Sequence, residues 1–215
     1  MAIIFHIVRH GETLLNKLNR AQGWSDSPLT NHGRTTAIEL GAMLKDIHFK
    51  AAYASDTIRA VQTAELILSS SGNHHVKVQS DNRLREWCLG TMDGELNSVF
   101  IQTVSEWLGG VSSFEELNKR LPDVASVIYH HDTTGMAESF ENILSRLKNA
   151  FLDFTQNELP DENSNILVAT HAFVIKTLFY LFAPGELCAI GKVKNTAIIT
   201  LIYDHGCFKF AKTEK

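Results

Sequence analysis

The strongest constraint on the fold is a repeated pattern in which a short apolar run ends in polar residues and a helical pattern follows. Residues 3–8 (IIFHIV), 51–54 (AAYA) and 166–169 (ILVA) are the clearest runs. Apolar runs of this length, bounded by polar residues, are typical of strands that are buried on both faces. Strands alternating with helices predict an α/β fold with a parallel sheet.

The rest of the chain extends this pattern. Apolar residues recur at helical spacing in four segments, which are residues 30–47, 57–68, 137–157 and 172–182. Weaker strand patterns occupy residues 76–79, 196–203 and 207–211. We therefore expect a three-layer αβα architecture, with a mostly parallel central sheet and helices on both of its faces.

Residues 93–135 depart from the alternation and are predicted to form an inserted, mainly helical segment. In an α/β fold such an insertion often forms a lid over the ligand site. The chain has only four prolines and shows no internal repeat or low-complexity linker. We expect residues 1–215 to form a single domain, with 93–135 as its lid.

Composition limits the classes of partner and the cellular location. The chain has 215 residues, of which 44% are hydrophobic, which is sufficient for a sizeable core. A net charge of -4 without a Lys/Arg cluster argues against a nucleic acid or a membrane surface as partner. No apolar stretch approaches the ~20 residues of a membrane helix, and no basic segment of a signal peptide precedes the first strand.

The cysteines support an intracellular location. Cys88, Cys188 and Cys207 are odd in number and far apart, and they form no CxxC pair. They are predicted to be reduced thiols in a cytoplasmic protein. The oligomeric state is not determined by the sequence, which is compatible with a homodimer.

Polar residues collect where the three strongest strands end. Residues 3–8 lead into Arg9-His10, residues 51–54 lead into Ser55-Asp56 with Arg59 one turn later, and residues 166–169 lead into Thr170-His171. The carboxyl ends of parallel strands emerge at one edge of a sheet, which is where α/β proteins bind ligands. We therefore expect two arginines and two histidines to converge there.

This group of side chains suits a phosphate ligand. Arginine presents a planar fork that matches two phosphate oxygens, and helix N-termini supply free N–H groups for an anion. A neutral imidazole can attack phosphorus, and Gly11 allows the backbone to approach the bound group. The leaving oxygen needs a proton, and Glu86 is the best candidate for the acid. We expect no metal and no cofactor, because the arginines and the second histidine can neutralise the charge that develops.

With these residues, the chain resembles the histidine phosphatase superfamily, also described as phosphoglycerate mutase-like. Its motifs occur in order over nearly the whole chain. The matching segments are Arg9-His10-Gly11-Glu12, Gln22-Gly23, Asp26-Ser27-Pro28-Leu29-Thr30, Arg59-Ala60-x-Gln62-Thr63-Ala64, Leu84-Arg85-Glu86, Ala137-Glu138-Ser139, Thr170-His171 and Asn195-Thr196.

The resemblance implies a role for each matching residue. His10 becomes phosphorylated, while Arg9, Arg59 and His171 hold the phosphoryl group. Glu86 acts first as a general acid and then as a base for water. Further phosphate contacts are expected from Asn16, Gln22, Gly23 and Ala172.

Three positions depart from the family pattern. Ala172 stands where the family usually has Gly after the second histidine, but its backbone N–H is retained. Asp93-Gly94 replaces a Glu-Gly pair, and Ala137 replaces the Gly of a Gly-Glu-Ser motif. None of these changes removes a catalytic group.

Several functions are compatible with these residues. We expect a phosphatase that hydrolyses a small phosphorylated substrate, because Leu15 replaces a Trp typical of the mutase branch. The insertion also favours hydrolysis, since residues 95–138 contain seven acidic and only two basic residues, Lys119 and Arg120.

The alternatives are a cofactor-dependent phosphoglycerate mutase, a catalytically silent phosphate-binding regulatory protein, and a metallohydrolase. The two arginines argue against a metal cation at the site. The sequence leaves the identity of the substrate open.

Overall fold

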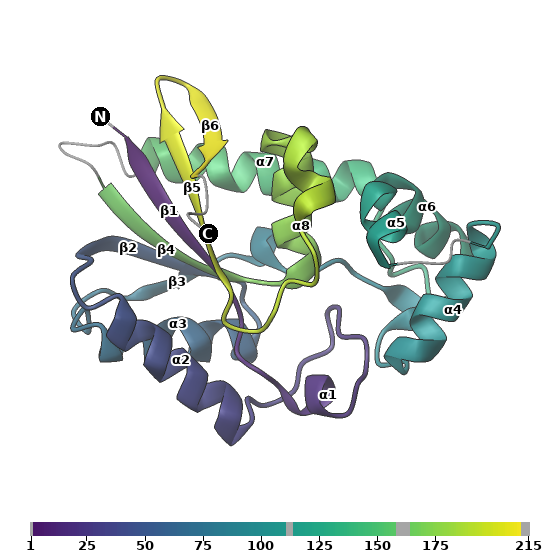
Figure 1. Ribbon diagram of the computed structural model, residues 1–215, viewed down its shortest axis with the longest axis horizontal. Helices are drawn as coiled ribbons and strands as arrows, with labels where there is room; N and C mark the ends of the chain where they lie inside the picture. Colours follow the sequence, from purple (N-terminus) through teal and green to yellow (C-terminus); the bar gives the residue numbers. More distant parts are fainter. Residues whose placement is uncertain (1, 111–113, 158–163, 212–215) are drawn as a thin grey trace.

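The computed structural model of the protein describes residues 2–110, 114–157 and 164–211 (Figure 1). Its centre is a six-stranded sheet with the order β3-β2-β4-β1-β5-β6. The strands are β1 (Ile3–Arg9), β2 (Phe49–Ala54), β3 (Val78–Ser80), β4 (Ser164–Thr170), β5 (Ile198–Asp204) and β6 (Cys207–Phe210).

The strands that carry the polar ends are neighbours in the sheet. β4 pairs in parallel with both β1 and β2, and β3 extends the parallel part beyond β2. β5 pairs antiparallel with β1, and β6 pairs antiparallel with β5. The sheet is therefore mixed, with a parallel core and an antiparallel edge.

Helices cover both faces of the sheet, so the predicted α/β class is confirmed (Figure 1). α2 and α3 pack on one face, and α7 and α8 pack on the other. The helices of eight or more residues are α2 (Asn31–Met43), α3 (Ile58–Ser70), α4 (Asn97–Trp107), α6 (Leu121–His131), α7 (Phe140–Asn157) and α8 (Ala172–Phe182). Shorter helical turns are α1 (Leu14–Lys17), α5 (Phe114–Lys119), η1 (Asn82–Leu84), η2 (Gly90–Met92) and η3 (Pro184–Ala189).

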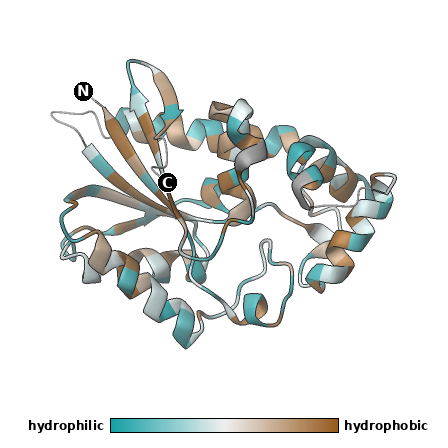
Figure 2. Cartoon of the chain, in the orientation of Figure 1, coloured by the Kyte–Doolittle hydropathy of each residue, from teal (hydrophilic) through white to brown (hydrophobic). Residues whose placement is uncertain are grey.

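Alternation along the strands divides the core into two clusters. Phe5, Ile7 and Val168 pack with α7 and α8, whereas Val8 and Ala169 pack with α2 and α3. Successive side chains of a strand point to opposite faces, so a strand buried on both sides is apolar throughout. Figure 2 shows hydrophobic residues along the central strands and a mixture of residue types along α2.

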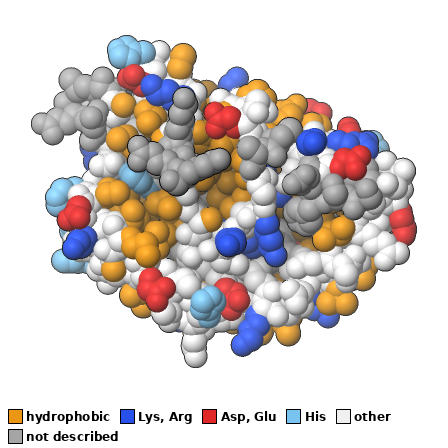
Figure 3. Space-filling view, in the orientation of Figure 1, with side chains coloured by type: hydrophobic (Ala, Val, Ile, Leu, Met, Phe, Trp, Pro, Cys, Tyr) orange, Lys and Arg blue, Asp and Glu red, His pale blue; other side chains and the backbone are white. Residues whose placement is uncertain are grey.

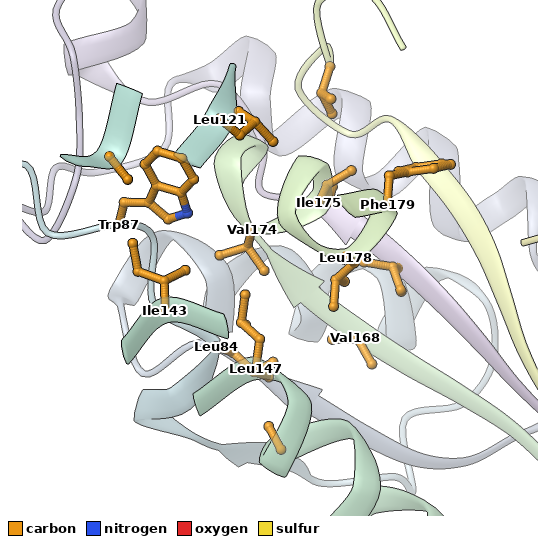
Figure 4. Close-up of a cluster of buried hydrophobic side chains, with 14 of the residues drawn as sticks. Leu84, Trp87, Leu121, Ile143, Leu147, Val168, Val174, Ile175, Leu178 and Phe179 are labelled. Atoms are coloured by element: carbon orange, nitrogen blue, oxygen red, sulfur yellow. The ribbon is translucent and has the colours of Figure 1, made fainter. Parts of the chain in front are cut away.

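The cluster on the α7–α8 face is the larger of the two (Figure 4). Leu84 and Trp87 lie in it next to Glu86, so the segment that carries the predicted acid is anchored by its neighbours. Side chains of α6 join the same cluster, among them Leu121. The insertion is thereby attached to the main core.

The predicted insertion at 93–135 contains α4, α5 and α6, which lie together to one side of the sheet (Figure 1). Asp132 holds the end of this segment, because its carboxylate accepts hydrogen bonds from the backbone N–H groups of Thr91, Met136 and Ala137. Burial raises the pKa of Asp132, but hydrogen bonds from Ala137, Thr134 and Thr91 outweigh it and lower that pKa below its ordinary range. None of the helices in the described ranges is long and apolar enough to cross a membrane.

Leu147 provides a test of the core on the α7–α8 face. It is fully buried on α7, and Lys148 beside it is exposed. Leu147→Ala should lower the free energy of unfolding by about 2–5 kcal/mol, since it removes buried methyl groups and leaves a cavity. Lys148→Ala should change it by less than about 0.5 kcal/mol. Urea unfolding of both variants measures the difference, and equal effects would contradict this packing.

Candidate active site

His10 follows β1 directly, at the edge where β1 and β4 end together. Arg9 is paired with Thr170, and the backbone N–H of His10 donates to the Thr170 carbonyl at 2.9 Å. The imidazole is 3% exposed, and its Nδ1 lies 2.8 Å from the carbonyl oxygen of Gly11. A carbonyl only accepts hydrogen bonds, so Nδ1 carries the proton and Nε2 keeps a free lone pair.

The surroundings of His10 favour this neutral form. Burial lowers the pKa of His10 well below 6.5, and the positive charges of Arg59 and Arg9 lower it further. Protonation would place a third positive charge among two arginines in a desolvated site. The imidazole of His10 is therefore uncharged at neutral pH.

Arg59 and His171 lie beside His10, and both are fully buried. Arg59 Nη2 donates to Nδ1 of His171 at 3.2 Å, and the rings of His10 and His171 are 5.2 Å apart between centroids. Because Nδ1 of His171 accepts, the neutral ring carries its proton on Nε2. Asp26 forms a salt bridge with Arg59 at 3.0 Å, which offsets part of the cost of burying its charge.

Three buried polar atoms have no hydrogen-bond partner among the described residues. They are Nε of Arg9, Nε of Arg59 and Nε2 of His171. Each is a donor, and all three belong to residues predicted from the sequence to hold a phosphoryl group. Buried donors are normally paired, so a group of three unpaired donors indicates the place of an anionic ligand.

The guanidinium of Arg9 is held in place by a backbone carbonyl. Its Nη1 donates to the carbonyl of Val193 at 2.7 Å, which fixes the guanidinium. Burial lowers the pKa of Arg9 to about 10, while Glu86 opposes and Arg59 adds to that shift. Arg9 remains charged at neutral pH.

Glu86 is 4% exposed and lies against the N-terminus of α8. Its carboxylate accepts hydrogen bonds from the backbone N–H groups of Phe173, Val174 and Trp87 at 3.1–3.2 Å. Burial raises the pKa of Glu86, and this outweighs the opposing effect of those N–H groups. A carboxyl group with a raised pKa is suited to donate a proton.

Arg146 holds the segment that carries Glu86, and it was not among the residues predicted from the sequence. From α7 it donates to the backbone carbonyls of Arg83, Arg85 and Glu86 at 2.7–3.0 Å. Its guanidinium also forms a two-pronged ion pair with Glu138 at 2.8 and 2.9 Å. One signal in the sequence could have indicated it. Glu138 lies in a motif of the family, and its carboxylate needs a cation as partner.

Gly11 packs closely on α2. A Cβ atom at Gly11 would lie 2.6 Å from the carbonyl oxygen of Gly33, and one at Gly33 would lie 2.2 Å from that of Glu12. The two glycines therefore allow backbone contact between the loop after β1 and α2. The approach of Gly11 to a bound group stays a prediction.

The backbone of Gly23 is hydrogen-bonded on both sides. Its N–H donates to the carboxylate of Asp93 at 2.9 Å, and its carbonyl accepts from Arg59 at 2.7 Å. The phosphate contact expected of Gly23 stays a prediction. Asp93, the shorter carboxylate noted in the sequence, fixes the loop that supports Arg59.

A cleft of about 190 Å³ opens at His10. Six of the predicted site residues line it, namely Arg9, His10, Asn16, Gln22, Glu86 and Ala172. Arg59, His171 and Gly23 are not among its lining residues. Figure 3 shows Lys and Arg side chains close together near the middle of one face of the molecule.

Asn16 and Gln22 are held in place beside the cleft. Asn195 donates to Oδ1 of Asn16 at 3.0 Å and to the carbonyl of His10 at 3.0 Å. The amide of Gln22 lies 2.7 Å from the hydroxyl of Thr13. Asn195 thus connects the segment before β5 to the loop that follows β1.

The described residues contain no group of three or more His, Cys, Asp or Glu side chains that could hold a metal ion. The two histidines of the site face arginines, which repel a cation. The residues are thus arranged to hold an anion.

A protein-family model describing the histidine phosphatase superfamily (branch 1) matches residues 5–214. The chain belongs to the histidine phosphatase superfamily. Members of this superfamily act as phosphatases or as mutases, so the family alone does not specify the reaction.

Proteins similar to this chain include some named as mutases and some named as phosphatases. A protein of Erwinia tasmaniensis named "Probable phosphoglycerate mutase GpmB" is 33% identical over 201 residues, covering 88% of this chain and 84% of its own. The structure of a phosphoglycerate mutase from Bacillus anthracis superposes with a TM-score of 0.91 at 34% identity, covering 99% and 92% of the two chains. The alpha-ribazole phosphatase of Shigella flexneri shares the fold, with a TM-score of 0.72 at 20% identity, covering 98% and 95%.

The ionisation of His10 and His171 can be measured directly. Burial and the neighbouring arginines lower the pKa of both imidazoles, so both should titrate below 6.5. Inorganic phosphate should raise both pKa values, because a bound anion stabilises the imidazolium form. NMR titration of the histidine ring signals measures this, with His10→Ala and His171→Ala to assign them. If the signals assigned to His10 and His171 titrate above 6.5 without phosphate, this description of their electrostatics is wrong.

Proposed function

We propose that this protein is a metal-independent phosphatase that hydrolyses phosphomonoesters through a phosphohistidine intermediate on His10. The observation that carries the proposal is the group of unpaired buried donors on Arg9, Arg59 and His171 next to a neutral imidazole. Binding of a phosphoryl group would satisfy these donors and leave His10 Nε2 facing phosphorus.

The arginines supply the charge that a phosphoryl group needs. A phosphomonoester carries close to two negative charges at neutral pH, and Arg9 and Arg59 provide two positive ones. His171 adds a neutral donor through Nε2. Asn16 and Gln22 line the cleft, and we assign them weaker contacts with the same group.

In the first step the lone pair of His10 Nε2 forms a bond to phosphorus, and the bond from phosphorus to the ester oxygen breaks. The leaving oxygen takes the proton of Glu86, so the product is a neutral alcohol and Glu86 becomes a carboxylate. Arg9 and Arg59 stabilise the charge on the transferred oxygens throughout.

In the second step water attacks the phosphohistidine. The Glu86 carboxylate takes a proton from the water molecule as the oxygen bonds to phosphorus. The bond between phosphorus and Nε2 breaks, which restores the neutral imidazole. Phosphate leaves, and Glu86 is again protonated for the next turnover.

Phosphoglycerate mutase activity is the second candidate, and the names of the relatives in Erwinia tasmaniensis and Bacillus anthracis favour it. In that reaction the phosphoryl group of His10 passes to a substrate hydroxyl and not to water. The insertion supports hydrolysis, because its two basic residues, Lys119 and Arg120, do not line the cleft. Arg120 instead pairs with Asp123 at 2.8 Å.

A silent phosphate-binding protein on this fold would have no need for both a nucleophile and an acid. This chain retains His10 with a free Nε2 and Glu86 with a raised pKa. The pair supports catalysis over binding alone.

Hydrolysis of p-nitrophenyl phosphate in excess chelator tests the proposal. Wild type should turn over, and His10→Ala should lose activity by a factor of about 10³ or more, because the nucleophile is removed. His74→Ala is the matched control, since His74 is exposed and lies outside the cleft. Wild-type turnover that is unchanged in His10→Ala would contradict the mechanism. With 3-phosphoglycerate, interconversion without phosphate release would assign the protein to the mutases.

The pH profile reports the two ionisations on which catalysis depends. Activity requires neutral His10, whose pKa is lowered from 6.5, and protonated Glu86, whose pKa is raised from 4.5. Corrected for substrate ionisation, kcat/KM should therefore fall on the acidic side as His10 gains a proton and on the basic side as Glu86 loses one.

Glu86→Gln should lower kcat by about 10²–10⁴ and remove the basic limb of the profile. Measuring kcat/KM of both proteins across the pH range provides the comparison. If the basic limb persists unchanged in Glu86→Gln, Glu86 is not the acid.

A further inference from the structure

The chain just before β5 wraps around Arg9 and His10. The backbone N–H of Arg9 donates to the carbonyl of Ala197, and the N–H of Thr196 donates to the carbonyl of Arg9, both at 3.0 Å. Asn195 adds a side-chain contact, since its Nδ2 donates to the carbonyl of His10 at 3.0 Å. Main-chain and side-chain hydrogen bonds thus attach this segment to the start of the site.

The backbone of the same segment adopts an uncommon conformation at Thr196. Its φ of 56° lies in the left-handed region, which a side chain branched at Cβ seldom occupies. The Thr196 hydroxyl donates to the carbonyl of Asn195 at 2.7 Å. Residues in this region persist where the surrounding contacts fix them, and they are frequent at functional sites. The turn places the side chain of Asn195 against the loop that follows β1.

The amide nitrogen of Asn195 is fully used in that position. Its Nδ2 donates to the carbonyl of His10 and to Oδ1 of Asn16, each at 3.0 Å. A primary amide has two N–H groups, so both of its donors are engaged. Asn195 is not among the residues that line the cleft, and it is therefore not placed to touch a ligand itself.

Asn16 receives one of these hydrogen bonds, and it does line the cleft. Its Oδ1 also accepts from the backbone N–H of Thr13 at 3.3 Å. The two ends of an amide group are alike in shape, so hydrogen bonds decide which end faces which way. With the oxygen turned to two donors, the Nδ2 group of Asn16 is left for the cleft.

The direction of this amide determines how Asn16 meets an anion. An N–H group can donate to a phosphoryl oxygen, whereas an amide oxygen only accepts and would repel it. The Thr13 contact is the longer of the two at Oδ1, so Asn195 is the stronger constraint on the direction. A residue outside the cleft therefore selects the orientation that suits a phosphoryl group.

We propose that Asn195 is a positioning residue, which holds the amide of Asn16 with its N–H groups toward the phosphoryl group. The carbonyl of His10 anchors one N–H of Asn195, and the other is thereby aimed at Asn16. The proposal rests on the proposed function, in which Asn16 contacts the phosphoryl group. Asn195 acts on the bound anion only through Asn16.

Calorimetric binding of inorganic phosphate, measured in two backgrounds, tests this route. Asn16→Ala should weaken binding by about tenfold, the range of a hydrogen bond to a charged group. Asn195→Ala should weaken it by about threefold to tenfold in the wild-type background, because the amide of Asn16 is released. In the Asn16→Ala background the same change should have an effect below about twofold, since residues that act through one contact are not additive. Equal factors in both backgrounds, or no effect in either, would overturn the proposal.

Asn195→Asp reverses the polarity without changing the shape. A carboxylate accepts and cannot donate, so the amide of Asn16 should rotate and turn its oxygen to the cleft. The added charge weakens phosphate binding in both backgrounds. The loss should therefore be larger by about tenfold when Asn16 is present than in Asn16→Ala. A loss that is equal in the two backgrounds would contradict the role of Asn195.

The controls separate positioning from a general loss of structure. Asn142→Ala, at an exposed position of α7 outside the cleft, should leave phosphate binding unchanged. Urea unfolding shows whether each variant is folded, and either Asn195 variant is sufficient for the comparison if the other does not fold. Lower stability by itself would act alike in both backgrounds.

Phosphate binding needs no turnover, so it distinguishes this proposal from the proposed function. If the backgrounds differ as expected while wild type does not hydrolyse p-nitrophenyl phosphate, the proposed function is rejected and Asn195 keeps its role. Hydrolysis by wild type with equal effects of Asn195→Ala in both backgrounds would keep the proposed function and overturn the role of Asn195. Absence of phosphate binding by wild type would overturn both.

Discussion

The parallel pairing of β4 with β1 and β2 is the constraint on which the site depends. The register sets Arg9 opposite Thr170 and Ala54 opposite Ala169, so the three strands end at the same level. His10 and His171 follow their strands by one residue and are thereby brought within 5.2 Å between ring centroids. A shift of one residue would turn the alternating side chains to the opposite faces of the sheet. The hydrophobic clusters on both faces therefore fix the position of the catalytic groups.

Burial then determines the chemistry of that site. The same desolvation lowers the pKa of His10 and raises the pKa of Glu86, because in each case it disfavours the charged form. The result is a neutral imidazole and a carboxyl group with a raised pKa in the lining of one cleft. The cost of burying Arg59 is offset by Asp26 and by the carbonyls of the loop that Asp93 holds.

Much of the fold could be predicted because local patterns and tertiary packing agree. α8 was predicted at its observed bounds, since its apolar residues and its position after a strand both indicate a buried helix. α7 begins at Phe140, three residues later than predicted, because Ala137 and Glu138 are used in contacts with Asp132 and Arg146. α1 was missed because a helix of four residues has no periodicity to detect. The antiparallel direction of β5 likewise depends on its partners and not on its own residues.

The sequence by itself determined the α/β class and the strand ends, and it named residues that the structure brings together, because these depend on local patterns and on short motifs. Only the tertiary structure decided which polar atoms stay unpaired, that the Gly23 amide is occupied by Asp93, and that Gly11 packs on Gly33. It also brought Asn195, from the segment before β5, to His10 and Asn16. Sequence spacing carries no information about such long-range contacts, since their geometry is set by how the elements pack.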